Sequence, residues 1–479
     1  MSENKVLKAG IGYTFANYLI SGLNFLTIPI FARLLSTSDY GIYNTFAAYQ
    51  SILFVFIGCA LNTSYKNARY KYKFKSESPN KSYCYEEYAS SSIVFTIINS
   101  VIYALILNIL YPYISKYIGI NRLLVNCLII ASFGQALISL FNADASLTYS
   151  YKSYIKISLV NAISNVIVSI FLIVFVLNVN KYYGRVFGNC IPLFFAGLYI
   201  IVKFFKRSKP GYTKGYIKWG LAYSLPIIPH AISQIILSQF DRIMINNMIG
   251  SSEAGIYSFA YTIFTIISVT YTSLDTVWSQ WFYDHLNKKL YKPIRTKSNI
   301  YMILMCMFSS MVILLSPEII TILGTSKFHD SIYCVIPIIV GGFLSFLYLI
   351  PAGVEYYTEN TKFIALGTTS AAIINIILNY VFILRYGYQA AAYTTLVTYL
   401  LNFIFHYLIS RKLYDVILFD LRVIVSSILL ILVIAIISFA YLDSFVIRLV
   451  IFIILMILFL IVEEKNIHLI AKIKLKYIK

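Results

Sequence analysis

Charged residues, cysteines and long polar stretches are all scarce in this 479-residue chain. Charged residues make up 12% of it and hydrophobic residues 59%, whereas soluble domains carry about 25% charged residues. The 6 cysteines form no CxxC pair or metal-ligand spacing, and the sequence has no Walker-type phosphate-binding loop for ATP. The longest stretch outside the apolar runs, residues 64–88, is too short to fold as a catalytic domain. We therefore expect no enzyme activity, no metal and no cofactor.

Apolar stretches fill the chain instead. About fourteen of them approach the roughly 20 residues that a helix needs to cross a bilayer. The first contains Asn17 and Asn24 and is longer than the hydrophobic part of a signal peptide, so we interpret it as a permanent helix. The sequence predicts an all-α integral membrane protein.

Landmarks of the first half return 214 positions later. The tract TSDYGIY at 37–43 returns as SSEAGIY at 251–257, and Asn161 and Asn165 return as Asn375 and Asn379. This constant offset predicts two pseudo-symmetric six-helix bundles, an arrangement typical of transporters whose substrate path lies between the repeats. The expected parts are an N-terminal bundle, a basic cytoplasmic linker, a second bundle, and two additional helices with a basic tail, at residues 1–205, 206–219, 220–410 and 411–479.

The formal net charge of +20 is explained mainly by membrane orientation. With the N-terminus in the cytoplasm, most of the 39 lysines and arginines fall in cytoplasmic loops and in the C-terminal tail, as the positive-inside rule requires. Anionic lipids of the inner leaflet attract the same loops. We therefore expect a multi-pass protein with both termini cytoplasmic, the lipid bilayer as a partner, and no nucleic-acid binding.

Polar side chains inside the apolar stretches mark candidate sites, because an amide or a charge that faces lipid is costly. In the first stretch, Asn17 and Asn24 share one helix face with Thr14 and Ser21. This row either forms hydrogen bonds between helices or lines an aqueous cavity. The sequence favours neither role over the other.

The seventh stretch is richer in polar groups. Two prolines three residues apart loosen the start of its helix. His230, Gln234 and Asp241 follow at steps of four and seven, which places them on one helix face. Arg242 lies about 100° further round the helix. We favour a cavity-facing role for Arg242, with a structural ion pair as the alternative.

Other candidates lie near the ends of the apolar stretches. Arg33 closes the first stretch, where it either snorkels to the headgroups or lines the cavity. Asp144 and Glu355 occupy near-equivalent positions of the repeat, and Asp275 lies late in the eighth stretch. Together with Asp241, these acids are candidates for ion coupling, although each also suits an ordinary interfacial position. The repeated asparagine pairs have the i,i+4 spacing of helix packing, which we favour over substrate contact.

Several of these tracts resemble one family. ARLLS at 32–36 and DYGIY at 39–43 resemble the start of bacterial polysaccharide repeat-unit flippases of the O-antigen and capsule type. SLPIIPH at 224–230, followed by Asp241, Arg242 and GIY at 255–257, resembles the same proteins. These flippases belong to the multidrug/oligosaccharidyl-lipid/polysaccharide exporter superfamily. The resemblance covers both predicted bundles.

The resemblance implies a V-shaped pair of bundles around a central cavity in the bacterial inner membrane. It implies that the protein flips undecaprenyl-diphosphate-linked oligosaccharide from the cytoplasmic to the periplasmic leaflet by alternating access, alongside other polysaccharide-assembly membrane proteins. It gives cavity-associated roles to Arg33, Asp241 and Arg242. Two alternatives stay open. A drug/cation antiporter of the same superfamily usually has a carboxylate in its first bundle, which the first stretch lacks. A membrane polymerase usually has a large outer loop, and no outer loop here is long.

Overall fold

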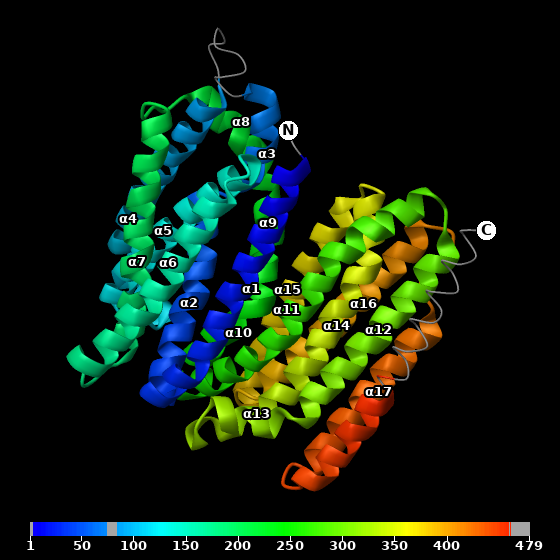
Figure 1. Cartoon of the computed structure of the whole chain (residues 1–479). Helices are drawn as coiled ribbons and strands as arrows, with labels where there is room; N and C mark the ends of the chain where they lie inside the picture. The colour runs from blue at the N-terminus through cyan, green and yellow to red at the C-terminus, as the bar shows by residue number, and fades with distance from the viewer. Residues whose placement is uncertain (1–2, 74–83, 459, 461–479) are drawn as a thin grey trace. The chain divides into compact units, whose positions relative to one another are not determined.

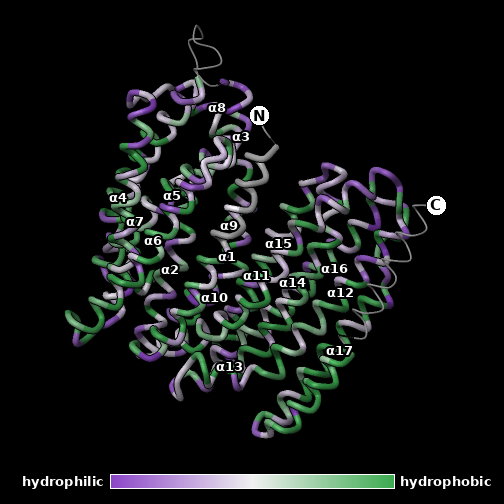
Figure 2. The backbone as a smooth tube through the Cα atoms, viewed as in Figure 1, coloured by the Kyte–Doolittle hydropathy of each residue, from purple (hydrophilic) through white to green (hydrophobic). Residues whose placement is uncertain are grey.

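The computed structural model describes residues 3–73, 84–458 and 460, without the side chains of residues 3–11, 14–17 and 276. Every regular element in this part of the chain is a helix. Among the described residues, 12 helices are long and apolar enough to cross a membrane, and two shorter apolar helices, Tyr18–Leu34 and Phe445–Leu458, complete the predicted series. Figure 2 shows hydrophobic residues along most of the helix lengths and hydrophilic residues gathered toward their ends. The prediction of an all-α integral membrane protein is confirmed (Figure 1).

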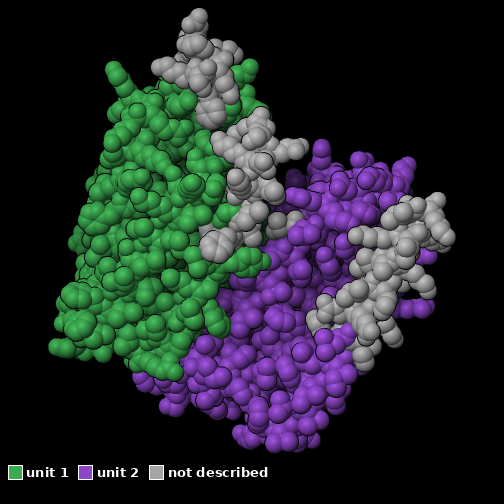
Figure 3. Space-filling model, in the orientation of Figure 1, with its two compact units in different colours: residues 1–255 green, residues 256–479 purple. Residues whose placement is uncertain are grey.

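The chain divides into two compact units, which Figure 3 colours separately. Unit 1 comprises residues 1–255 and unit 2 comprises residues 256–479. The repeat in the sequence places the seventh stretch at the start of the second bundle. In the structure this stretch is part of unit 1, because its helices α9 (Ile228–Ile235) and α10 (Asp241–Met248) pack along α2 (Thr37–Gly58).

The helices of unit 1 follow one another with short connections. Besides α2, α9 and α10, they are α1 (Glu3–Leu34), α3 (Tyr65–Tyr72), α4 (Tyr85–Ile118), α5 (Arg122–Leu147), α6 (Tyr151–Phe171), α7 (Tyr182–Arg207) and α8 (Lys214–Ser224). α5 is the central helix of this unit, since it packs against α2, α4 and α7 (Figure 1). Its apolar side chains therefore supply much of the buried core.

Aromatic side chains of α3, α4 and α8 pack together at one end of unit 1. The ring of Tyr88 lies 5.6–5.9 Å from the rings of Tyr65, Tyr72, Tyr216 and Trp219, measured between centroids. Burial raises the pKa of Tyr65 well above its usual value, so its hydroxyl is neutral. This cluster holds α8, and with it the beginning of the seventh stretch, on unit 1.

The two repeated tracts touch each other within unit 1. Thr37 Oγ1 lies 2.8 Å from Ser252 Oγ, and Ser38 Oγ lies 2.7 Å from Ser251 Oγ. Because Thr37 corresponds to Ser251 and Ser38 to Ser252 in the repeat, the two contacts are reciprocal, which is the pattern of a local two-fold axis. A β-carbon on Gly41 would lie 1.8 Å from the Ser251 carbonyl oxygen, so this close approach requires glycine.

Unit 2 is built around one buried helix. α14 (Ile332–Tyr357) is buried along most of its length and packs against α12 (Tyr291–Leu314), α15 (Thr361–Tyr386) and α16 (Ala390–Leu413). α11 (Ser251–Asn287) begins in unit 1 and continues into unit 2. The remaining described elements are α13 (Ser316–Leu323), the 3₁₀ helix Ser326–Ser331, α17 (Leu421–Ala440) and the short helix Phe445–Leu458.

The two additional C-terminal helices are integral parts of unit 2. α17 packs on α12, where the Cys306 thiol lies 3.2 Å from the Ser427 carbonyl oxygen. Arg448 of the last helix is 2% exposed and donates to both carboxylate oxygens of Glu318 in α13, at 2.6 and 2.7 Å. A bidentate pair of this kind fixes both position and orientation, so it anchors the last helix on α13.

Candidate functional site

The predicted cavity residues of α1 lie on an accessible helix. Asn24 is exposed. Arg33 is also exposed and donates from Nη1 to the Pro29 carbonyl oxygen, 2.9 Å away. The side chains of Asn17 and Thr14 lie outside the described residues. Asn24 and Arg33 can therefore be reached from the surroundings of unit 1.

The seventh stretch is interrupted twice. The first interruption is a 3₁₀ turn at Leu225–Ile227, where the two prolines were predicted to loosen the helix. The second is the π-helical segment Ile236–Phe240, which was not predicted. A π-helical turn shifts the register of the residues that follow it. The shared face predicted for His230, Gln234 and Asp241 assumed an uninterrupted helix. Asp241 is buried, whereas His230, Gln234 and Arg242 are half-buried.

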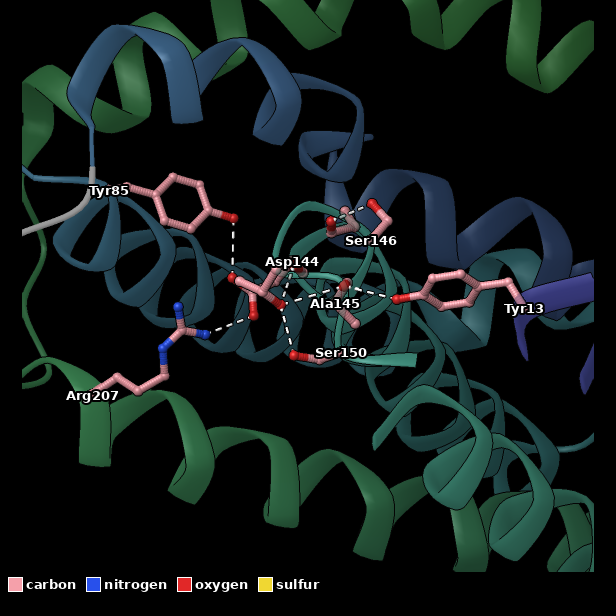
Figure 4. Close-up of polar contacts among 9 residues, drawn as sticks. Tyr13, Tyr85, Asp144, Ala145, Ser146, Ser150 and Arg207 are labelled. Carbon is pink, nitrogen blue, oxygen red and sulfur yellow. Dashed lines mark hydrogen bonds and ion pairs between the residues drawn. The ribbon is translucent and has the colours of Figure 1, made fainter. Parts of the chain in front are cut away.

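Asp144 binds partners from two neighbouring helices (Figure 4). Its Oδ2 lies 2.6 Å from Nη1 of Arg207 at the end of α7, and its Oδ1 accepts a hydrogen bond from the Tyr85 hydroxyl at 3.1 Å. The adjacent Ala145 carbonyl oxygen accepts from Tyr13 of α1 at 2.8 Å. These contacts tie α1, α4 and α7 to the end of α5. The carboxylate is thus neutralised by an arginine.

A cavity of about 500 Å³ lies beside Arg207, between the start of α4 and the connection from α7 to α8. Glu86 and Glu87 line it together with Lys206 and Lys209. Because both signs of charge line this cavity, it does not discriminate between an anion and a cation by charge alone.

A chain of hydrogen bonds joins α2, α6 and α7 inside unit 1. Asn189 donates from Nδ2 to Gln50 Oε1 at 2.6 Å, and Asn165 donates from Nδ2 to Asn189 Oδ1 at 3.2 Å. Arg185 donates from Nη1 to Asn165 Oδ1 at 2.6 Å and to Ser169 Oγ at 3.4 Å. Each amide is oriented by the next one, so the chain presents an oxygen to Arg185. We call these five residues the Arg185 network.

The side chains that contact the Arg185 guanidinium are all neutral. Its Cζ lies 3.9 Å from the ring centroid of Phe31 and 4.5 Å from that of Tyr43. Among the described residues, no carboxylate forms an ion pair with it. Asp39, at the start of α2, instead accepts from the backbone N–H of Tyr182 at 3.2 Å and caps its own helix. The network therefore carries one uncompensated positive charge.

Two glycines allow α7 to approach α6 at this point. Gly184 and Gly188 stand one helical turn apart, and a β-carbon on Gly188 would lie 2.0 Å from Ser169 Oγ. Small residues at this spacing let membrane helices pack closely. Arg185 follows the first glycine directly and so lies at the contact. The prediction missed Arg185, although this glycine spacing next to a repeated asparagine pair was a usable signal.

Unit 2 encloses a second acid–base pair. Glu355 Oε1 lies 2.7 Å from His406 Nδ1, and both side chains are 0% exposed. Glu355 was a predicted candidate for ion coupling, but its partner His406 was missed because α16 is apolar around it. Asp275 is half-buried and accepts from Ser279 at 3.2 Å.

The repeated asparagines of unit 2 form a buried network. Asn379 donates to Asn375 Oδ1 at 3.1 Å, and Asn375 donates to Thr395 Oγ1 at 3.1 Å. Thr394 donates to Asn379. These bonds link α15 to α16, which is the packing role that the i,i+4 spacing favours. The described residues hold no cluster of three histidine, cysteine, aspartate or glutamate side chains that could bind a metal.

Comparison with known proteins adds a family and a fold. The sequence profile of the family described as polysaccharide biosynthesis protein matches residues 6–281, more than half of the chain. Protein 1 of the Lsg locus of Haemophilus influenzae is 23% identical over 389 residues, which cover 77% of this chain and 89% of that protein.

Two solved structures share the fold. The lipid II flippase MurJ, in an inward closed conformation, superimposes with a TM-score of 0.72 at 16% identity, covering 95% of this chain and 99% of MurJ. An inward-facing multidrug resistance MATE transporter of the MOP superfamily has a TM-score of 0.61 at 12% identity, covering 82% of this chain and 94% of that chain. At these identities the likeness concerns the fold alone.

Proposed function

The chain belongs to the polysaccharide biosynthesis protein family, and we propose that it flips undecaprenyl-diphosphate-linked oligosaccharide repeat units across the membrane by alternating access. The transfer runs from the cytoplasmic to the periplasmic leaflet and serves O-antigen, capsule or exopolysaccharide synthesis. The proposal includes a bacterial inner-membrane location, cytoplasmic termini, and other polysaccharide-assembly membrane proteins as partners. We also propose that a linker at residues 206–219 separates the two six-helix bundles of the sequence repeat.

One observation carries this function: the membrane helices of unit 1 leave a positive charge uncompensated. Asp144 is neutralised by Arg207, Glu87 accepts from the Tyr216 hydroxyl at 2.9 Å, and Asp39 caps α2. Arg185 has only neutral partners and aromatic rings around it. A positive interior favours an anionic cargo, and a diphosphate of roughly two charges would gain about 4–5 kcal/mol per 100 mV by moving outward.

The residues predicted from the sequence keep the roles assigned there. Arg33, Arg242, Asn17, Asn24, His230 and Gln234 are proposed to line the substrate cavity. Asp144 and Glu355 each have a basic partner at 2.6–2.7 Å, so their charges are already balanced when that partner is protonated. Asp144, Glu355, Asp241 and Asp275 stay the proposed candidates for ion coupling.

The test is a gene deletion followed by analysis of lipid-linked sugars in each leaflet. Complete repeat units stranded in the inner leaflet support a flippase. Unpolymerised units in the outer leaflet point to a polymerase. Unchanged glycans with altered drug tolerance point to the drug/cation antiporter, whose fold the chain shares.

Arg242→Ala is expected to abolish export of the surface polysaccharide while leaving the amount of protein in the membrane normal, because the cavity loses a cation that the cargo needs. Arg422→Ala is the matched control, since Arg422 is exposed at the start of α17. Cell-surface polysaccharide and membrane protein are quantified in the same cultures. Normal export by the Arg242 variant would show that Arg242 does not bind the cargo in the cavity.

A further inference from the structure

We propose that Arg185 forms an anion subsite inside the first bundle that binds the diphosphate of the lipid-linked cargo. This inference rests on the proposed function for the identity of its ligand, although the subsite itself is argued from the geometry of unit 1. The subsite comprises the guanidinium of Arg185, the amides that orient it and the two rings that flank it.

The guanidinium has donors to spare. It carries five N–H donors, and its two hydrogen bonds, to Asn165 and Ser169, use Nη1 alone. Nε and Nη2 have no hydrogen-bond partner within the described part of the chain. Arg185 is half-buried, so these donors are open to a ligand or to water. Unsatisfied cationic donors are costly among membrane helices, which favours their use on an anion.

The subsite is organised before any ligand arrives. Gln50 is 9% exposed and anchors Asn189, which orients Asn165, which in turn accepts from Arg185. The rings of Phe31 and Tyr43 hold the cation by cation–π contact without neutralising it. A fixed guanidinium loses little conformational freedom on binding, so more of the interaction appears as affinity.

The chemistry of these donors selects the ligand class. The remaining Nε–H and Nη2–H groups form the planar fork that matches two oxygens of a phosphate or a carboxylate. A diphosphate carries more negative charge than a monophosphate, and the lipid alcohol carries none. The subsite therefore recognises the diphosphate that links lipid to sugar and is indifferent to which sugars follow.

The position of Arg185 along α7 indicates the stage of the transfer at which it binds the diphosphate. It stands three residues after the start of α7, about 4.5 Å along the helix axis. With the N-terminus in the cytoplasm, α7 begins at the outer surface. The subsite then lies toward the periplasmic side, where it receives the diphosphate late in the transfer.

Three variants separate anion binding from a structural role. Arg185→Ala removes the cation, and Arg185→Lys keeps the charge but loses the fork. Asn165→Asp places a carboxylate where Asn165 now accepts at 2.6 Å, so it neutralises Arg185 and keeps that bond, but it loses the donation from Asn165 Nδ2 to Asn189 Oδ1. If Arg185 only held α6 to α7, the Asp variant, which keeps the bond to Arg185, would bind the diphosphate as tightly as the wild type. Arg122→Ala is the control, because Arg122 also donates to an asparagine, Asn108, at 3.2 Å on the same unit but is exposed.

The experiment measures lipid binding to the purified full-length chain in nanodiscs by native mass spectrometry. The probes are undecaprenyl diphosphate, undecaprenyl phosphate and undecaprenol. We expect the Arg185→Ala and Asn165→Asp variants to bind the diphosphate about 10- to 100-fold more weakly, with undecaprenol binding unchanged. Arg185→Lys should fall between them and the wild type, and Arg122→Ala should match the wild type.

Wild-type diphosphate affinity in both the Arg185→Ala and the Asn165→Asp variants overturns the subsite. An equal loss for undecaprenol also overturns it, because it would indicate damage to the fold. If Arg185→Ala does not fold, Asn165→Asp and Arg185→Lys still decide the question. Failure of the proposed function looks different: the gene deletion would strand no repeat units, although Arg185-dependent diphosphate binding would persist.

Discussion

Each unit places an acid–base pair near the end of its central helix, but the two pairs have different surroundings. Asp144 near the end of α5 pairs with Arg207 of α7, and Glu355 near the end of α14 pairs with His406 of α16. The Arg207 side chain is 31% exposed, whereas Glu355 and His406 are both 0% exposed. The first pair is open to water and the second is closed.

The basic partners, Arg207 and His406, differ in a way that matches the different exposure of the two pairs. Arginine keeps its proton in proteins, and the exposed part of Arg207 can be hydrated. His406 is charged only when protonated, and its Nε2, like Glu355 Oε2, has no hydrogen-bond partner in the described part of the chain. A net charge on this pair would be buried in the membrane, where it is costly.

The same contrast holds for the asparagine networks. Asn165 is half-buried and accepts from an uncompensated arginine, whereas its repeat equivalent Asn379 is 0% exposed and bonded to Asn375 and Thr394. Asparagines at positions 214 residues apart thus have different partners in the two units. Unit 1 carries open, charged sites, and the corresponding sites of unit 2 are buried.

The largest effect is expected from Glu355→Ala, which leaves His406 without its partner in a closed site. We expect a loss of about 3–5 kcal/mol in the free energy of unfolding. Asp144→Ala should lose about 1–2 kcal/mol, because Arg207 can turn toward water. Reversible unfolding in mixed detergent micelles measures both. Equal losses would show that the two pairs do not differ in accessibility.

An intermediate effect is expected from Gly367→Ala. A β-carbon there would lie 2.7 Å from His406 Nε2 and 2.8 Å from the Phe405 ring, so overpacking should cost about 1–3 kcal/mol. Gly215 of α8 has open space around it, and Gly215→Ala should be neutral or stabilising by up to about 1 kcal/mol. The same unfolding assay compares the two. A tolerated alanine at 367 would mean that the site of His406 can expand.

The smallest effect is expected from salt. Raising the ionic strength from 0.1 to 1 M shortens the screening length from about 10 to 3 Å, which should weaken the open Asp144–Arg207 pair by a few tenths of a kcal/mol. The Glu355–His406 pair should not respond, since no solvent reaches it. Double-mutant cycles at both salt concentrations measure each coupling energy. A salt-sensitive Glu355–His406 coupling would contradict its closure.

Local patterns in the sequence predicted a good part of the fold. The apolar stretches and the prolines that interrupt the seventh one each depend on neighbouring residues only. The π-helical segment before Asp241 and the inclusion of the seventh stretch in unit 1 could not be predicted in that way. Both depend on how that stretch packs against α2.

The partners of the polar groups were also beyond the sequence. Asp144 and Glu355 were recognised as related positions, but Arg207 and His406 lie 63 and 51 residues further along the chain. Arg185 lies 20 residues from Asn165 and joins it only because two helices pack closely at Gly188. The spacing of residues within one helix cannot predict a contact between side chains of two different helices.

Hydrophobicity along the chain determined that this protein is helical and spans a membrane, because lipid requires each helix to satisfy its own backbone hydrogen bonds. The tertiary structure alone decided which charges are balanced. Asp144 pairs with Arg207, Glu355 lies 2.7 Å from a buried histidine, and Arg185 has no carboxylate partner in the described part of the chain, since charge compensation depends on distances between helices that are far apart in sequence.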